Sequence, residues 1–257
     1  MLRRILKRVL PEYLLHQLRR ARIHPRLREM GVVPKPARIP VEFFGTEYGG
    51  FAVDPRCIDK DSIVYVLGAG LDISFEEELI ARCGCHVHVY DPTPRSVEWL
   101  NGRYKAGIAS HPVGEKLFIH PVGIWSDDKR LRFYAPEQSD HVSYSLTNLQ
   151  RTDVYIEVDC ISVVTAMRQN GHARIDLLKL NVEGAEYAIL NAMFESGVRP
   201  MLLLVNYDEV HTQGDADAPN RLRQISKRIV GNGYRVVYAE LSRVTYALDS
   251  ADAPELS

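Results

Sequence analysis

The feature that most constrains the fold is a regular alternation of strand-like and helix-like segments between residues 63 and 230. The strand-like segments are short runs of Val, Ile and Leu, and the helix-like segments repeat apolar residues every three or four positions. This alternation predicts a mostly parallel sheet covered by helices on both faces. A hairpin over 234–239 and 243–248 is expected to add an antiparallel edge. The other strands are expected at 63–67, 86–90, 116–122, 130–134, 154–158, 175–180 and 201–205, and the helices at 75–82, 95–104, 185–194 and 220–230, with one more ending at Gln169.

The length and composition indicate an ordinary soluble globular protein. A chain of 257 residues fits one sizeable α/β domain with an appendage, which we place at 39–257 and 1–38. The chain is 46% apolar and 25% charged, as such domains usually are. Its net charge of −1 argues against a nucleic-acid-binding protein.

The first 29 residues differ from the rest of the chain in charge. They hold nine Lys or Arg and two Glu, and their apolar residues recur at helical spacing, which predicts a basic amphipathic helix. Three interpretations stay open. The helix contacts an anionic membrane surface, packs on its own domain, or contacts a second copy in a homo-oligomer.

The expected location is the cytoplasm. The sequence has no apolar run of about 18 residues that would predict a transmembrane helix. Lys7, Arg8 and Pro11 interrupt the apolar residues near the N-terminus, so these do not form the core of a signal peptide. The four cysteines have neither zinc-site nor disulfide spacing and are expected to be reduced thiols.

Two short motifs follow the first two expected strands. Gly68-Ala-Gly70 comes directly after the first, where glycines let the backbone turn tightly and approach a ligand. A dinucleotide fingerprint would continue with a third glycine, but this chain has Ile73 there. Asp91 lies about 20 residues further on, where an acid binds ribose hydroxyls, although an Asp before Pro also forms ordinary turns. Together the motifs favour an adenosine ligand without pyrophosphate, such as S-adenosylmethionine.

Four longer motifs are spread over residues 43–248. They are Tyr48-Gly-Gly50, Tyr65-Val-Leu-Gly-Ala-Gly-Leu-Asp-Ile-Ser-Phe75, Asp91-Pro-Thr-Pro94 and Leu178-Lys-Leu-Asn-Val-Glu-Gly-Ala-Glu-Tyr187. In combination they resemble the FkbM-like methyltransferases, more narrowly the branch with a Gly-x-Asp-x-Ser-Phe turn and an Asp-Pro-Thr-Pro element. The resemblance implies a class I, Rossmann-like methyltransferase fold with a seven-stranded sheet whose last strand is antiparallel. It also implies S-adenosylmethionine as methyl donor, and O-methylation of sugars or other small metabolites.

The resemblance also implies which residues bind the cofactor. The two glycines face its methionine part, and Asp72 holds the ammonium group through a charge-assisted hydrogen bond. Trp125 flanks the adenine, with packing in the core as the open alternative. The full implied set is Tyr48, Gly68, Gly70, Asp72, Asp91, Trp125 and Asn181.

Two strand ends depart from the family's commoner pattern. This chain has Asn181-Val-Glu-Gly184 in place of Asp-x-Glu-Gly, and Asn206 stands where an acid is frequent. An amide does not act as a general base and offers no charge to a divalent cation, so we expect no metal site. Asn181 can still bind the cofactor's ammonium or orient a substrate hydroxyl. Glu183 is a candidate base, or else an acid favoured by a helix N-terminus.

The remaining candidates lie in two polar stretches. His211 is the best candidate general base, because an unperturbed imidazole is largely neutral near pH 7. With Asp208 and Glu183 it makes up the predicted catalytic set. A long connection often serves as a lid or binding loop, and one such connection supplies the candidate acceptor contacts His141, Ser143 and Tyr144.

The sequence therefore predicts an S-adenosylmethionine-dependent methyltransferase that acts on a small-molecule or glycan hydroxyl. Two alternatives stay open. One is a protein of the same fold that binds the cofactor without catalysis. The amides Asn181 and Asn206, at positions where the family commonly has acids, would account for the lack of catalysis. The other is a nucleotide-dependent oxidoreductase, against which the missing third glycine counts.

Overall fold

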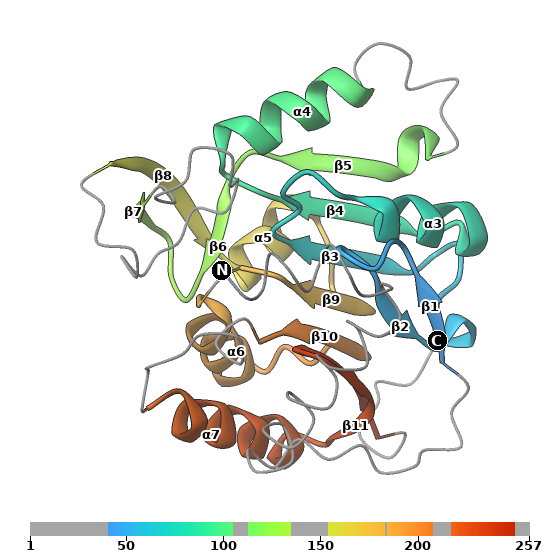
Figure 1. Cartoon of the computed structure of the whole chain (residues 1–257), viewed down its shortest axis with the longest axis vertical. Helices are drawn as coiled ribbons and strands as arrows, with labels where there is room; N and C mark the ends of the chain where they lie inside the picture. The colour runs from blue at the N-terminus through green and yellow to red at the C-terminus, as the bar shows by residue number, and fades with distance from the viewer. Residues whose placement is uncertain (1–40, 105–112, 135–153, 183, 208–216, 250–257) are drawn as a thin grey trace, which may run out of the picture.

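The computed structural model describes residues 41–104, 113–134, 154–182, 184–207 and 217–249. Its centre is a seven-stranded sheet with the strand order β11-β12-β10-β9-β3-β4-β5 (Figure 1). Strands β3, β4, β5, β9 and β10 run parallel to one another, and β12 is antiparallel to both of its neighbours. The predicted mostly parallel sheet with its C-terminal hairpin is confirmed. The strands are β3 (Ile63–Leu67), β4 (His86–Tyr90), β5 (Leu117–His120), β9 (Leu177–Leu180), β10 (Leu202–Asn206), β11 (Tyr234–Glu240) and β12 (Arg243–Leu248).

The C-terminal hairpin differs from the prediction in one respect. The antiparallel strand β12 does not form the edge of the sheet, because it inserts between β10 and β11. The edge strand β11 therefore runs in the same direction as the parallel strands. Insertion suits the composition of β12, whose residues Val244 to Leu248 are all buried and so need cover on both faces.

Helices cover both faces of the sheet, as the alternation predicted. Side chains of a strand point alternately to the two faces, so Val64 and Val66 belong to one core cluster and Tyr65 and Leu67 to the other. Helices α3 (Ser74–Cys83) and α4 (Pro94–Tyr104) pack on the first face. Helices α5 (Val163–Asn170), α6 (Glu186–Glu195) and α7 (Ala218–Gly231) pack on the second.

Two smaller sheets flank the main one, and the sequence patterns did not predict them as separate sheets. Strands β6 (Gly123–Trp125), β8 (Tyr155–Ser162) and β7 (Lys129–Tyr134) form a three-stranded sheet in that order. Strands β1 (Glu42–Phe44) and β2 (Phe51–Val53) form an antiparallel hairpin. The turn of this hairpin is the segment that carries Tyr48. Two short 3-10 helices, η1 (Pro55–Cys57) and η3 (Gly114–Lys116), complete the described elements.

A row of histidine and aromatic side chains lies across β3, β4 and β5. The Nδ1 atom of His88 lies 3.0 Å from the Nε2 atom of His120, and the ring of Tyr90 stacks on His120 with centroids 4.4 Å apart. The Tyr65 hydroxyl lies 2.8 Å from Nδ1 of His172. Burial, reinforced by the neighbouring histidines, lowers the pKa of His88 to about 3. The row is therefore built from neutral imidazoles at neutral pH.

The order of the strands places four loop starts at one edge. Leu67 pairs with Tyr90 on one side and with Leu180 on the other, and Leu180 pairs with Val205. The residues that follow these strand ends therefore meet at the carboxyl edge, where the strand order reverses and open α/β sheets bind ligands. Within the described ranges, no helix is both long and apolar enough to span a membrane. The predicted basic arm at 1–38 lies outside those ranges.

Candidate active site

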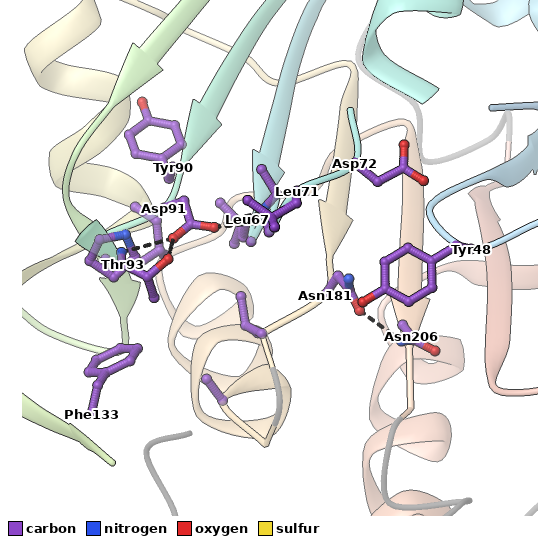
Figure 2. Close-up of a pocket in the computed structure, with 18 of the residues that line it drawn as sticks. Tyr48, Leu67, Leu71, Asp72, Tyr90, Asp91, Thr93, Phe133, Asn181 and Asn206 are labelled. Carbon is purple, nitrogen blue, oxygen red and sulfur yellow. Dashed lines mark hydrogen bonds between the residues drawn. The ribbon is translucent and has the colours of Figure 1, made fainter. Parts of the chain in front are cut away.

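A cavity of about 470 Å³ lies at the carboxyl edge of the sheet (Figure 2). Asp72, Tyr48, Asn181 and Asn206 lie on one side of the cavity. Tyr90, Thr93 and Phe133 lie on the other side. The walls come from the β1–β2 turn, the turn after β3, the start of the loop after β4, the ends of β9 and β10, and strands β6 and β7. The residues that line it include Thr46, Tyr48, Gly68, Gly70, Asp72, Asp91, Ile124, Phe133, Asn181 and Asn206.

The floor of the cavity is the backbone of the glycine turn. Gly68 has a φ of +81°, and a Cβ atom there would lie 2.1 Å from the carbonyl oxygen of Asn181. Gly70 has a φ of +58°, but a Cβ there would meet no atom within 4 Å. Gly68 therefore permits the close approach of two strand ends, whereas Gly70 leaves open space above the backbone. Both predicted glycines line the cavity.

Asp91 lines the cavity, but its carboxylate is engaged by the protein. Oδ2 accepts hydrogen bonds from the backbone N–H groups of Ala69 and Gly70, both at 3.0 Å. Oδ1 accepts from the Thr93 N–H at 2.9 Å and from the Thr93 hydroxyl at 2.6 Å. A carboxylate has about four lone-pair positions, so these donors use its capacity. In the structure, Asp91 therefore fixes the glycine turn, and its predicted contact with a ribose stays a prediction.

Asp72 lies on the opposite side of the turn. Its Oδ1 accepts from the Ser74 N–H at 2.9 Å, and its Oδ2 accepts from the Thr46 hydroxyl at 2.5 Å. Burial raises the pKa of this carboxyl, but the hydrogen bonds from Ser74 and Thr46, together with the charge of Lys179, outweigh burial and place the pKa below its ordinary value. Asp72 is therefore held ionised at the wall of the cavity.

Tyr48 stands at the mouth of the cavity. The β1–β2 turn that carries it is fixed by two contacts: the Thr46 hydroxyl donates to Asp72, and Arg243 donates to the carbonyl oxygens of Glu47 and Gly50 at 2.8 and 2.6 Å. The tyrosine is 81% exposed although it belongs to the lining. A ligand in the cavity would therefore cover an aromatic ring that is otherwise in solvent.

The two asparagines at the strand ends contact each other. Nδ2 of Asn206 donates to Oδ1 of Asn181 at 2.7 Å, and the Ser242 hydroxyl donates to Oδ1 of Asn206 at 2.6 Å. These contacts join Ser242 in the β11–β12 turn to Asn206 at the end of β10 and to Asn181 just after β9, and none of the three side chains is charged. Both amides line the cavity. They can donate to and accept from a bound hydroxyl, but they do not take up a proton near neutral pH.

The apolar wall of the cavity uses a residue that the sequence analysis missed. Phe133 of β7 and Ile124 of β6 line the cavity. Trp125, the predicted adenine neighbour, does not belong to the lining and packs against the two core clusters beside it. Alternation in β7 could have indicated Phe133, because Leu131 and Phe133 are flanked by Arg130 and Arg132.

The predicted catalytic and acceptor residues lie outside the described residues. These are Glu183, Asp208 and His211, and the acceptor candidates His141, Ser143 and Tyr144. Their roles stay predictions. Among the residues that are described, no group of three or more His, Cys, Asp or Glu side chains is arranged to hold a metal ion.

The topology and the cavity together define a class of protein. Six strands that run in one direction with one antiparallel strand inserted among them, a glycine turn after the central strand and a cavity at the strand ends are those of a class I, Rossmann-like methyltransferase. Residues 67–236 match the model of the methyltransferase FkbM domain family. Because the match spans more than half of the chain, the chain belongs to this family.

Individual relatives are more distant. The chain is 26% identical over 157 residues to a Rattus norvegicus protein described as probable methyltransferase-like protein 24, and the match covers 60% of this chain and 35% of that one. The chain therefore spans about a third of the length of this curated relative. Methyltransferase FkbM from Methylobacillus flagellatus KT is similar at 12% identity with a TM-score of 0.49, over 74% of this chain and 44% of that one. The SAH-bound methyltransferase PaMTH1 of Podospora anserina is similar at 7% identity with a TM-score of 0.43, over 74% and 72%.

Proposed function

We propose that the protein transfers a methyl group from S-adenosylmethionine to a hydroxyl group of a small molecule or glycan. The observation that carries the proposal is the juxtaposition, in one cavity, of a backbone cradle at Gly68–Gly70 and an uncharged amide pair at Asn181 and Asn206. The first suits a methyl donor and the second suits a neutral hydroxyl acceptor.

The described residues fit the donor. S-adenosylmethionine supplies an electrophilic methyl group on a sulfonium centre. Open space above Gly70 leaves room for the methionine part, and the ionised Asp72 is placed to bind its ammonium group. Phe133 and Ile124 offer an apolar wall for the adenine. Asp91 supports the ribose region by fixing the turn, and direct binding of the ribose would require it to exchange one of its present donors.

The amide pair supports an oriented hydroxyl acceptor. Methyl transfer depends mainly on in-line positioning of the nucleophile and the methyl group, and a fixed amide can position an oxygen. Since neither asparagine takes up the proton, a base has to come from elsewhere. We propose His211, assisted by Asp208 or Glu183, for this role, because these residues follow β10 and β9 directly in the sequence.

The test is a methyl-transfer screen with S-adenosylmethionine labelled in its methyl group. The acceptors tested are neutral sugars, sugar acids, phenols and primary amines. The labelled products are then treated with mild alkali. Ethers formed at a hydroxyl keep the label, whereas methyl esters release methanol. Alkali-stable label on a hydroxyl compound supports the proposal. Transfer only to amines or carboxylates contradicts the assignment of the acceptor.

The amide pair also favours a second candidate, a protein that binds the cofactor without turning it over. The two candidates differ in the same screen when binding is measured in parallel. Donor binding with no label on any acceptor, together with appearance of label in an Asn181→Asp variant, would favour the second. Turnover by the wild-type chain excludes it.

A further inference from the structure

One aromatic residue at the mouth of the cavity contributes little to the packing of the fold. Tyr48 belongs to the cavity lining, yet it is 81% exposed. Hydrophobic stabilisation follows the apolar area removed from water, so a tyrosine this exposed adds little to the free energy of unfolding. Side chains on loops that a rigid scaffold holds in place are commonly used for binding. The ring of Tyr48 is therefore a candidate contact for a ligand at the mouth of the cavity.

The turn that carries Tyr48 is fixed although its aromatic ring is exposed. The N–H groups of Gly50 and Gly49 donate to the carbonyl oxygen and the hydroxyl of Thr46 at 2.8 and 3.2 Å. The turn also packs on the wall of the cavity, because a Cβ atom at Gly49 would lie 2.9 Å from Cγ of Asp72. A ligand that contacts a loop already held in one conformation pays little of the ordering entropy that weakens binding.

The polar and the apolar side chains of the lining lie on opposite sides of the cavity. Three polar side chains share the side of Tyr48, namely Asp72, Asn181 and Asn206 (Figure 2). Phe133 lies on the other side. An aromatic face beside amide and carboxylate groups suits a saturated ring with several hydroxyls, whose C–H groups pack on the aromatic ring while the hydroxyls form hydrogen bonds. A site built to bind hydroxyls rejects an analogue that leaves its polar groups unpaired.

The charge of the lining discriminates among rings of this kind. Within the described part of the lining, Asp72 and Asp91 are acids, and Lys, Arg and His are absent. A phosphate or a carboxylate on the acceptor would therefore lose water without gaining a cation as a partner, and an unpaired charge in a site of this kind is costly. The sulfonium charge of the methyl donor, in contrast, suits an acidic lining.

We propose that Tyr48 is a specificity-determining residue of the acceptor site, where its ring stacks on an uncharged, polyhydroxylated ring whose hydroxyls contact Asn181 and Asn206. The inference rests on the proposed function, because it takes the amide pair to orient the acceptor hydroxyl. The resemblance to the family implied a contact of Tyr48 with the cofactor, so this role differs from the expected one. Acceptors that present a phosphate, a nucleotide or a carboxylate at this place are excluded.

Two measurements on the full chain separate the acceptor role from a cofactor role. Calorimetric titration of S-adenosylhomocysteine reports on the donor site. Transfer of labelled methyl groups reports on the acceptor site, with the methyl glycosides of glucose, galactose and mannose as probes, each paired with its uronic acid and its 6-phosphate. For the wild type, kcat/KM should be at least about tenfold higher for a neutral glycoside than for its two anionic counterparts.

Three variants complete the experiment. In Tyr48→Ala, kcat/KM for the neutral glycoside should fall about tenfold or more through a higher KM, as expected for the loss of an aromatic contact. The affinity for S-adenosylhomocysteine should stay within about twofold. Tyr48→Phe keeps the ring and should stay within about threefold of the wild type in both measurements. The matched control is Tyr238→Ala in the edge strand β11, outside the cavity lining, which should leave both measurements unchanged.

The outcomes are distinguishable. Equal losses of S-adenosylhomocysteine affinity and of glycoside methylation in Tyr48→Ala would assign Tyr48 to the cofactor and overturn the inference, as would unchanged glycoside methylation. Preference for the anionic counterparts, or methylation of phenols without any neutral glycoside, would also overturn it while the proposed function stands. If the wild-type protein binds no S-adenosylhomocysteine, or labels no hydroxyl compound, the proposed function itself fails, and the inference fails with it.

Discussion

The glycine turn makes a sharp prediction, because its two glycines serve different purposes. Gly68, Gly70 and Gly171 all have left-handed backbone conformations, with φ values of +81°, +58° and +71°. A Cβ atom at Gly68 would lie 2.1 Å from the carbonyl oxygen of Asn181, whereas at the other two positions it would meet nothing within 4 Å. Gly171 caps α5, so it reports the cost of the conformation alone. Three alanine variants therefore separate conformational strain, steric overlap and ligand exclusion.

The magnitudes follow from the geometry. An L residue in the left-handed region costs about 1–2 kcal/mol, partly offset by the lower entropy of the unfolded chain, so Gly171→Ala and Gly70→Ala should each cost about 1 kcal/mol. Relief of the overlap at Gly68 requires β3 and β9 to separate at their ends. That movement breaks the hydrogen bond from the Asn181 N–H to the Leu67 carbonyl. With about 1 kcal/mol for this bond added to the cost of the conformation, Gly68→Ala should cost about 2 kcal/mol or more.

Urea denaturation and calorimetric titration of S-adenosylhomocysteine measure the two effects. Gly171→Ala should lose a little stability and no affinity. Gly70→Ala should be as stable as Gly171→Ala but should bind S-adenosylhomocysteine more weakly, because the added methyl group enters the cavity. Gly68→Ala should lose the most stability. The reasoning is refuted if Gly68→Ala is no less stable than Gly171→Ala, or if Gly70→Ala binds S-adenosylhomocysteine like the wild type.

Three further predictions use other parts of the molecule. The pKa of His88 is about 3 in the folded chain and about 6.5 in the unfolded chain. The contribution of neutral His88 to the free energy of unfolding is therefore fully present above pH 6.5 and is lost as the pH falls toward 3. At pH 5 the loss of stability amounts to about 2 kcal/mol. Urea midpoints at pH 7.5 and pH 5 should show that loss, and His88→Gln should reduce it; a pH-independent difference between the two proteins would contradict this. Asp91→Ala leaves four hydrogen-bond donors without their acceptor. It should lower the free energy of unfolding by about 3 kcal/mol or more and abolish most of the affinity for S-adenosylhomocysteine. Unchanged affinity in a calorimetric titration would reject the role of Asp91 in the turn. If residues 1–29 dock on membranes, their deletion should abolish co-sedimentation with anionic vesicles, whereas equal pelleting of the intact protein with and without vesicles would exclude that interpretation.

The main sheet could be predicted from the sequence because its strands are buried on both faces. Short, almost continuous apolar runs between helix-like segments, such as Ile63–Leu67 and Leu202–Asn206, are typical of buried parallel strands. The insertion of β12 was missed, because the order of two antiparallel strands depends on tertiary packing and not on local pattern. The three-stranded sheet was missed for a related reason, since β6 has only three residues and pairs with β8 more than thirty positions later.

The candidate site was predictable in position but not in its contacts. The motifs at Gly68, Asp91 and Asn181 correctly indicated the carboxyl edge of the sheet. The sequence did not reveal that the Asp91 carboxylate fixes the glycine turn, because the donors Ala69 and Gly70 come from another strand end. Lys179 was visible only as an interruption among leucines, and Glu76, its partner in a buried ion pair, lies 103 positions away. Long-range pairs of this kind become apparent only when the register of the sheet is known.

Parallel calorimetric titration of the protein with S-adenosylmethionine, S-adenosylhomocysteine and NAD would show directly whether the cavity binds a methyl donor. The cavity is lined by the backbone of Gly68 and Gly70 and by Asp72, and the turn lacks the third glycine of a pyrophosphate-binding motif. We expect saturable binding of the first two ligands and no binding of NAD. Binding of NAD in preference to both, or binding of none of the three, would contradict a methyl-donor site in this cavity.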